Sequence, residues 1–421
     1  MYEFKPVSDR VKKMHQRVRD RIIQIDAERA TIITESSKKY EAVTPIIKRP
    51  LVTHDVCSQM TVLVDDEDRF VGNRGAHFCG AGVNPEWAGG GWIPGVIKKG
   101  QWKLEEDGMY HSSKEEDTKC CITKEDYEKL AEIDEYWKTR RISATANAWQ
   151  PEGFKEFCEL GASSYTPGQD IMGLPLGHLT PGYQKIINVG YGAIRKQARD
   201  WIEAHKGDMM GEDIKKYLFY ESAAVAADAA SVMVRRYGEA CLKKAEGEQG
   251  AARKAELKQM GESLLWISEN PARTFWEACQ AILLYLLFLH VDSSYPAIAL
   301  GRLDQNTWPF LKADLEAGRL TLEEAQELID FFILKATSFY NPSHPFVIMM
   351  VGAGNTYQHT TIGGVDPETE EDATNPVTYM VLETLARLQI HDPTISLRTN
   401  RNTPEKLWEC AIEATRRVGG V

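Results

Sequence analysis

The sequence contains no hydrophobic run long enough to cross a membrane. Its longest apolar stretch, Ala281–Leu289, is far shorter than the roughly 20 residues that a spanning helix requires, and Gln280 and His290 flank it. We interpret this stretch as a helix buried on most sides and expect no membrane partner. Residues 1–21 are charged throughout and lack the apolar core of a secretory signal peptide.

Cysteine motifs are also lacking, because no two of the eight cysteines form a CxxC pair. A chain of 421 residues folds without disulfides, so we expect free thiols in a reducing, cytoplasmic compartment. The adjacent pair Cys120-Cys121 lies in the acidic, polar stretch KEEDTKCCITKEDYEK. Nearby carboxylates disfavour a thiolate, and we interpret the pair as solvated and without a function.

Three further absences exclude whole classes of function. The net charge is −11 and Lys and Arg form no cluster, which argues against nucleic-acid binding. The ten histidines are scattered with no HExxH, so no metal site is expected. Gly80-Ala-Gly82 begins like a dinucleotide-binding loop, but Pro85 occupies the third glycine position.

Helical signals dominate the second half of the sequence. Thr321 and Glu324 form a capping box, and Thr403-Pro404 places a cap residue before a proline at the first helical position. The expected helices are Tyr183–Ala204, Gly211–Ala245, Ala251–Glu269, Arg273–His290, Thr321–Phe339, Asn375–Gln389 and Thr403–Val418.

The first half is less regular. Residues 10–50 are charged and predict helix that turns extended at Thr44–Pro50, with Asp26 marking a helix start. Residues 72–101 are rich in Gly, Trp and Pro and predict a long irregular loop. Thr123 is expected to cap a helix that runs to Arg140.

Short apolar segments between the helices predict strands. Pro345–Val351 is continuously apolar, Ala297–Leu300 is short and apolar, and Thr394–Thr399 alternates Ile395 and Leu397 with Ser396 and Arg398. Buried strands alternating with helices indicate an α/β architecture. No linker or repeat divides the chain, so we expect one large domain over residues 1–421.

Short motifs spread along the chain occur in a characteristic order. They are Glu28–Ser36, Lys48–Pro50, Arg69–Asn73, Gly177–Tyr183, Pro271–Ala278, Gly301–Gln305, Trp308-Pro309, Gly318–Thr321, Glu324–Glu327, Gly363–Asp366, Asp372–Asn375, Pro393–Arg398 and Asn402–Pro404. Together they resemble the glycyl radical enzyme family of the pyruvate formate-lyase type, in its dehydratase- and decarboxylase-like branch. The resemblance covers most of the chain and is weakest over residues 74–140.

The resemblance implies a helix-rich α/β fold, a barrel of two half-sheets wrapped by helices, in which a cysteine loop meets a glycine loop. Glycine holds a backbone radical because it can flatten without steric hindrance. A radical S-adenosylmethionine activating enzyme with an iron–sulfur cluster would install that radical, and no other cofactor is expected. A homodimer is also implied.

The family's Gly-Cys-x-Glu loop and its C-terminal glycine loop are expected beyond Val421. Residues 1–421 would then be the N-terminal part of the domain, and the barrel would be incomplete at its C-terminal side. No catalytic residue is assigned within the chain, which is expected to be inactive alone.

The resemblance also indicates a substrate pocket. Its candidate residues are His178, Tyr183, Ser294, Tyr295, Pro296, Ala297 and Arg398. Diol dehydratase relatives carry a polar His-Ser pair where this chain has Pro296-Ala297, so this wall is less polar. Arg398 either binds a substrate carboxylate through two hydrogen bonds or forms a structural ion pair. Arg302 and Asp304 are expected to be structural.

These observations predict a radical lyase that breaks a C–C or C–X bond in a small organic acid or alcohol. Formate C-acetyltransferase activity and diol or hydroxyproline-type dehydration remain alternatives. An alternative of another class is a non-catalytic paralogue, or a half-protein that serves as a scaffold.

Overall fold

The structure is a computed structural model. It describes residues 2–87, 92–112, 119–149, 151, 153, 179–293, 297–340, 358–390 and 392–419. These residues form a large helical body and a smaller lobe, each with its own hydrophobic core. The expected strand Pro345–Val351 lies outside the described residues.

The smaller lobe is built on a five-stranded sheet with the order β2-β1-β5-β4-β3. Its strands are β1 (Ile23–Asp26), β2 (Ala81–Gly82), β3 (Lys103–Leu104), β4 (Met109–His111) and β5 (Cys120–Thr123). β1 runs parallel to β2 and β5, whereas β3, β4 and β5 are antiparallel. The lobe also carries α2 (Glu28–Lys39), α4 (Trp92–Lys98), α5 (Lys124–Trp137) and α6 (Ile142–Ala148).

This sheet corrects two expectations from the sequence. Part of the stretch assigned to charged helix, and part of the expected loop at 72–101, are strands of two to four residues. Cys120 and Cys121 are buried on β5, between β1 and β4, and are not solvated. The prediction was wrong because it used the composition of the surrounding residues, whereas the burial of a short strand depends on the strands that pair with it.

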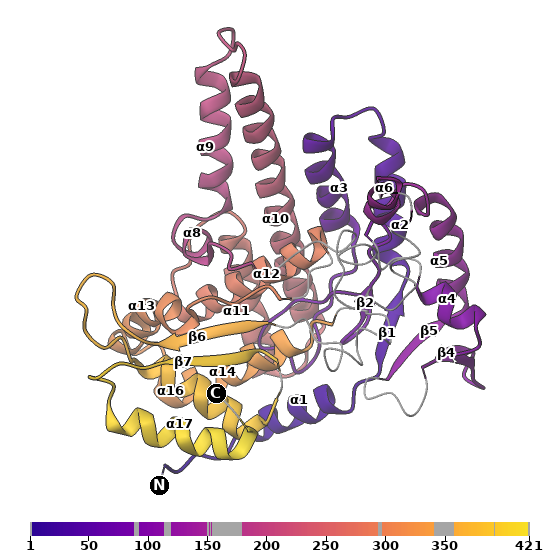
Figure 1. The fold of residues 1–421 in the computed structure, drawn as a ribbon. Helices are drawn as coiled ribbons and strands as arrows, with labels where there is room; N and C mark the ends of the chain where they lie inside the picture. The colour runs from indigo at the N-terminus through magenta and orange to yellow at the C-terminus, as the bar shows by residue number, and fades with distance from the viewer. Residues whose placement is uncertain are drawn as a thin grey trace.

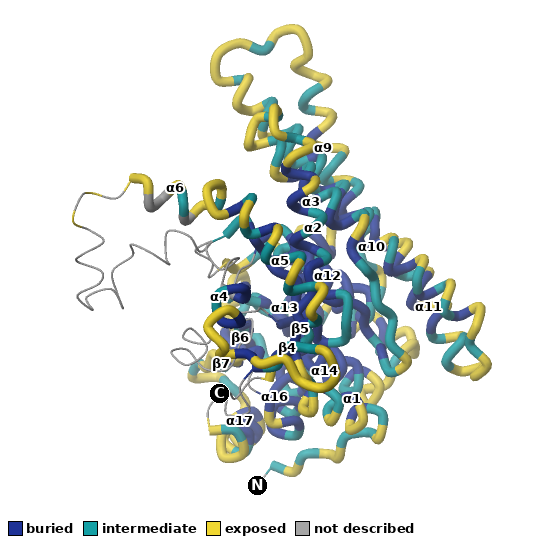
Figure 2. Tube along the Cα trace, turned by 90° about the vertical axis from the view of Figure 1, so that its right-hand side faces the viewer, coloured by how far each residue is buried: buried dark blue, intermediate teal, exposed yellow. Residues whose placement is uncertain are grey.

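The helical body contains eleven of the described helices. They are α1 (Asp9–Arg19), α3 (Pro45–Gln59), α8 (Tyr183–Val189), α9 (Tyr191–Ala204), α10 (Asp213–Gly247), α11 (Ala251–Ile267), α12 (Phe275–Asp292), α13 (Leu303–Glu316), α14 (Leu322–Thr337), α16 (Pro376–Leu388) and α17 (Glu405–Val418). The outer parts of α9 and α10 project from the body (Figure 1), and their connecting tip is exposed (Figure 2).

Helix ends agree with the sequence at some positions and differ at others. The capping box at Thr321 and the cap at Thr123 are confirmed. Thr44–Pro50 is not extended, because Pro45 occupies the first turn of α3, where a missing N–H costs nothing. The expected helix Tyr183–Ala204 is broken at Gly190, which has a φ of 80°. Thr403 does not cap α17; its hydroxyl donates to Asp372 at 3.0 Å.

Helix α12 lies at the centre of the body. It is apolar and long enough to pass a length-and-composition test for a membrane span, but most of it is buried within the protein. Its dark blue trace in Figure 2 lies inside the surrounding helices. The expectation that Ala281–Leu289 belongs to a helix buried on most sides is therefore confirmed.

A second, parallel sheet lies against α13 and joins β6 (His359–Gly363) to β7 (Thr394–Arg398). Isolated parallel bridges extend it from β6 to Gly301 and, farther along, from Ile298 to Leu179. β7 is the edge strand of this sheet among the described residues. The described residues show no closed barrel, so that part of the expected fold is not seen, whereas the helix-rich α/β class agrees with the structure.

Candidate active site

The β6–β7 sheet has one buried face and one partly open face. Thr360 and Ile362 on β6 pair with Ile395 and Leu397 on β7, and the first three of these are buried. Successive side chains of a strand point to opposite faces, so His359, Thr361, Ser396 and Arg398 share the other face. None of these four side chains is fully buried. The partly open face is therefore polar.

Asp304 anchors the end of β6 from behind. Its carboxylate is fully buried and accepts hydrogen bonds from the Gly363 N–H at 2.7 Å and from the Thr378 hydroxyl at 2.7 Å. Burial raises the pKa of Asp304, although these hydrogen bonds favour the ionised form. Asp304 thus ties α13 to β6 and α16, which confirms the structural role expected for it.

The backbone around Gly363 brings the motif Gly301–Gln305 next to Arg398. The Arg302 guanidinium donates to the Gly363 carbonyl, and the Gly364 N–H donates to the Arg398 carbonyl at 2.8 Å. A side chain at Gly364, where φ is 88°, would lie 3.2 Å from the Arg398 Cβ. Gly301–Gln305 and Thr394–Arg398, which are far apart in sequence, therefore lie side by side.

Arg398 occupies the end of the open face. Its side chain is exposed, and no ion pair joins it to any acidic residue that the structure describes. A structural ion pair, one of the two roles considered for this residue, is therefore absent among the described groups. A guanidinium in this position presents its donors in a planar fork that matches a carboxylate or sulfonate.

Tyr183 begins α8 beneath the sheet segment that includes Gly301. The Tyr183 ring is buried, meets the Tyr285 ring edge-on at a centroid distance of 5.7 Å, and lies 3.7 Å from where a Gly301 Cβ would be. Its hydroxyl has no hydrogen-bond partner among the described residues, and burial raises its pKa well above the ordinary value. The Tyr183 hydroxyl is therefore uncharged, and its surroundings are apolar.

Of the remaining pocket candidates, only Ala297 is described. Its φ of 68° is left-handed, which is uncommon for a residue with a Cβ, and it directly precedes the bridge at Ile298. His178, Ser294, Tyr295 and Pro296 lie outside the described residues. Ala297 thus precedes the segment that bridges to β6 through Gly301, Arg398 ends β7, and Tyr183 lies on α8 behind Gly301.

Local sequence signals did not single out His359 and Ser396. The His359 Nε2 atom lies 2.8 Å from the Ser396 hydroxyl, across the β6–β7 pair and on the same face as Arg398. The alternation in Thr394–Thr399 placed Ser396 beside Arg398, but nothing local indicated which strand pairs with it. The polar pair becomes visible only through the strand register.

Metal and thiol chemistry find no support in the described part of the chain. No group of three metal-binding side chains occurs there. The seven described cysteines are all buried, and burial raises the pKa of Cys79, Cys241 and Cys410 to about 12 and that of Cys121 to about 11. None belongs to β6, β7 or the segment 297–301.

Comparisons with known proteins agree with this architecture. Residues 5–421 match the family model described as Pyruvate formate lyase-like. The chain is 28% identical to isethionate sulfite-lyase from Nitratidesulfovibrio vulgaris, over 92% of this chain and 46% of that protein. It is 27% identical to (2S)-3-sulfopropanediol dehydratase from Klebsiella oxytoca, over 97% of this chain and 48% of that one.

A solved structure supports the same relationship. The B12-independent glycerol dehydratase from Clostridium butyricum superimposes with a TM-score of 0.88 at 26% identity, covering 98% of this chain and 50% of that one. The chain thus spans about half the length of the relatives it matches. Because the family model covers nearly every residue, the chain belongs to the Pyruvate formate lyase-like family of glycyl radical enzymes.

Proposed function

We propose that this chain supplies the substrate-orienting half of a glycyl radical lyase that breaks a C–C or C–X bond in a small organic anion. The observation that carries the proposal is Arg398, which ends β7 on a polar, partly open sheet face without an ion-pair partner among the described residues. A guanidinium so placed binds a carboxylate or sulfonate through two parallel hydrogen bonds.

The relatives support an anionic substrate. Isethionate sulfite-lyase and (2S)-3-sulfopropanediol dehydratase are named for sulfonates, and an indoleacetate decarboxylase from Tractidigestivibacter scatoligenes, 23% identical to this chain, is named for a carboxylate. Sulfonates and carboxylates share the oxygen geometry that an arginine recognises. This common chemistry favours an anionic substrate over an uncharged diol.

The residues of the chain would act by positioning. Arg398 would hold the anion at one end of the open face, and the His359–Ser396 pair, 2.8 Å apart, would present a polar group to a substrate hydroxyl or leaving group. The radical glycine and the relaying thiol would come from the remainder of the family fold. An activating enzyme with S-adenosylmethionine and an iron–sulfur cluster would generate the radical, in a cytoplasmic homodimer.

The decisive experiment assembles the enzyme with both radical loops, from the full gene or by co-expression of the missing half, and activates it anaerobically. A glycine-centred doublet in electron paramagnetic resonance is expected. A substrate panel then compares sulfonates, carboxylates, diols, hydroxyproline and pyruvate. No radical signal after efficient activation would overturn the enzyme assignment and favour the scaffold alternative.

Arg398 variants test the anion site itself. Arg398→Ala is expected to raise KM for an anionic substrate by about 100-fold, because a charged bidentate contact contributes roughly 1.5–3 kcal/mol, and Arg398→Lys is expected to recover part of it. Arg401→Ala, an exposed arginine in the turn after β7, is the matched control. Equal kinetic constants for Arg398→Ala and Arg401→Ala would refute the role of Arg398.

A further inference from the structure

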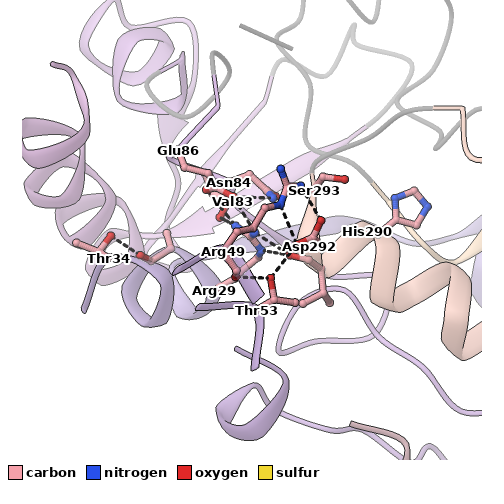
Figure 3. A network of polar contacts seen from close by, with 12 residues as sticks. Arg29, Thr34, Arg49, Thr53, Val83, Asn84, Glu86, His290, Asp292 and Ser293 are labelled. Atoms are coloured by element: carbon pink, nitrogen blue, oxygen red, sulfur yellow. Dashed lines mark hydrogen bonds and ion pairs between the residues drawn. The ribbon is translucent and has the colours of Figure 1, made fainter. Parts of the chain in front are cut away.

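The C-terminal turn of α12 is held by arginines from three other segments of the chain. We call Arg29, Arg49 and Arg74 the arginine clamp; Figure 3 shows Arg29 and Arg49 converging on the end of the helix at Asp292. Arg29 belongs to α2, Arg49 to α3, and Arg74 to the segment that leads into β2. The clamp thus connects the smaller lobe to the last turn of α12.

Arg29 makes the most extensive of these contacts. Its Nε and Nη2 atoms both donate to the Val291 carbonyl, at 3.0 and 2.7 Å. Its guanidinium also donates to the Glu86 carboxylate, at 3.2 and 2.8 Å. The Arg29 side chain is only 6% exposed, so its charge is neutralised inside the protein by Glu86 while it caps the helix.

Arg49 and Arg74 hold the neighbouring positions. Arg49 donates to both Asp292 carboxylate oxygens, at 3.2 and 2.6 Å, and the Thr53 hydroxyl adds a third hydrogen bond at 2.8 Å. Arg74 donates to the His290 carbonyl at 3.4 Å and to the Tyr340 carbonyl at 3.0 Å. Burial and the nearby Arg29 lower the pKa of Arg74 to about 9.

These contacts have a clear physical basis. The last carbonyls of a helix have no partner within it, and cations near a helix C-terminus are favoured by the helix dipole. Burying Arg29 and Arg74 here is nonetheless expensive, because their charges leave water, whereas the Arg49 side chain is about half exposed. Arg29 and Arg74 donate to the carbonyls of Val291 and His290, and Arg49 pairs with the Asp292 side chain. Three successive residues of this turn are therefore held by arginines, which indicates that its position matters.

The segment after α12 explains why that position matters. Five residues after Asp292 the chain reaches Ala297, and Ile298 then bridges Leu179 while the Leu300 N–H donates to the His359 carbonyl at 2.7 Å. The segment Ala297–Gly301 therefore enters the candidate active-site sheet directly after the clamped turn. Because only five positions separate Asp292 from Ala297, we expect the position of the helix end to limit where the strand that borders β6 can lie.

We propose that the arginine clamp is a positioning device that fixes Ala297–Gly301, and with it one wall of the substrate site. The clamp then contributes to substrate selectivity, although Arg29, Arg49 and Arg74 are not among the pocket candidates. This inference rests on the proposed function for its link to substrate, but its structural part does not require activity.

The test uses the double variant Arg49→Met/Asp292→Asn, which removes both members of the ion pair. Hydrogen–deuterium exchange of peptides covering 297–301 is expected to accelerate about 10-fold, with little change in β1 and β5. Arg235→Met, which removes an exposed arginine that pairs with Glu269 on the far helices, is the matched control. Arg49→Lys, which keeps the charge, serves as the milder variant if the double variant folds poorly.

In the assembled enzyme, the same variant is expected to raise KM several-fold while kcat changes little. Unchanged exchange at 297–301, or acceleration spread equally over both lobes, would overturn the clamp proposal. Accelerated exchange at 297–301 together with an unchanged KM would retain the mechanical link and refute its role in selectivity. If Arg398→Ala and Arg401→Ala have equal kinetic constants while exchange at 297–301 accelerates, the anion site is refuted and the clamp is not.

Discussion

Replacing Asp304 with alanine should be among the most damaging single substitutions in this chain. The fully buried carboxylate accepts from the Gly363 N–H and the Thr378 hydroxyl, both at 2.7 Å. Without it, two buried donors lose their partner, at about 1–3 kcal/mol each. We expect the free energy of unfolding to fall by about 4 kcal/mol, a large share of the 5–15 kcal/mol typical of a folded domain.

The assay is urea denaturation followed by circular dichroism and tryptophan fluorescence. Asp304→Asn keeps one oxygen and should cost about half as much, and Thr378→Val, which removes one of the two donors, should cost about 1 kcal/mol. Asp208→Ala, at an exposed turn, is the control. A loss below about 1 kcal/mol for Asp304→Ala would show that the carboxylate does not anchor β6, and would contradict the reasoning.

Three further predictions concern stability. Glu256 contacts Arg10 and Arg253, and although burial raises its pKa, these arginines outweigh that effect and hold the pKa below the ordinary 4.5. Glu256→Gln should therefore lower the free energy of unfolding by about 2 kcal/mol at pH 7. In urea titrations below pH 4, the variant and the wild type should become equally stable; a difference in stability that persists in acid would contradict this. Gly301→Ala, at a φ of 69°, should cost about 1–2 kcal/mol in thermal melting, whereas Gly95→Ala, in open space within α4, should not destabilise. Tyr183→Phe should change stability by less than about 1 kcal/mol, and a larger loss would reveal a hydrogen-bond partner for the hydroxyl.

The sequence predicted the parts of the fold that local signals encode. Four features carry their structural signal within a few residues. They are the capping box at Thr321, the cap at Thr123, the apolar helix α12 and the alternation in Thr394–Arg398. The five-stranded sheet could not be predicted in the same way. Strands as short as Ala81–Gly82 show no alternation, and their burial comes from partners distant in sequence.

The candidate site shows the same division. Arg398 was identified because it ends an alternating strand, and Asp304 because it belongs to the motif Gly301–Gln305. The pairing of His359 with Ser396 depends on the register between β6 and β7. The two residues are 37 positions apart, so local sequence patterns do not predict this register. The clamp on α12 was equally hidden, because Arg29 and Val291 are 262 positions apart.

The position of β7 at the edge of its sheet also affects how the chain can be handled. Thr394, Ser396 and Arg398 direct their peptide groups towards β6, so those of Ile395 and Leu397 face outwards. No described strand covers this edge, and an exposed row of peptide groups recruits extended segments from other chains. Preparations of residues 1–421 alone should therefore self-associate as concentration rises, and an added peptide that aligns with Ile395 and Leu397 should keep them dispersed.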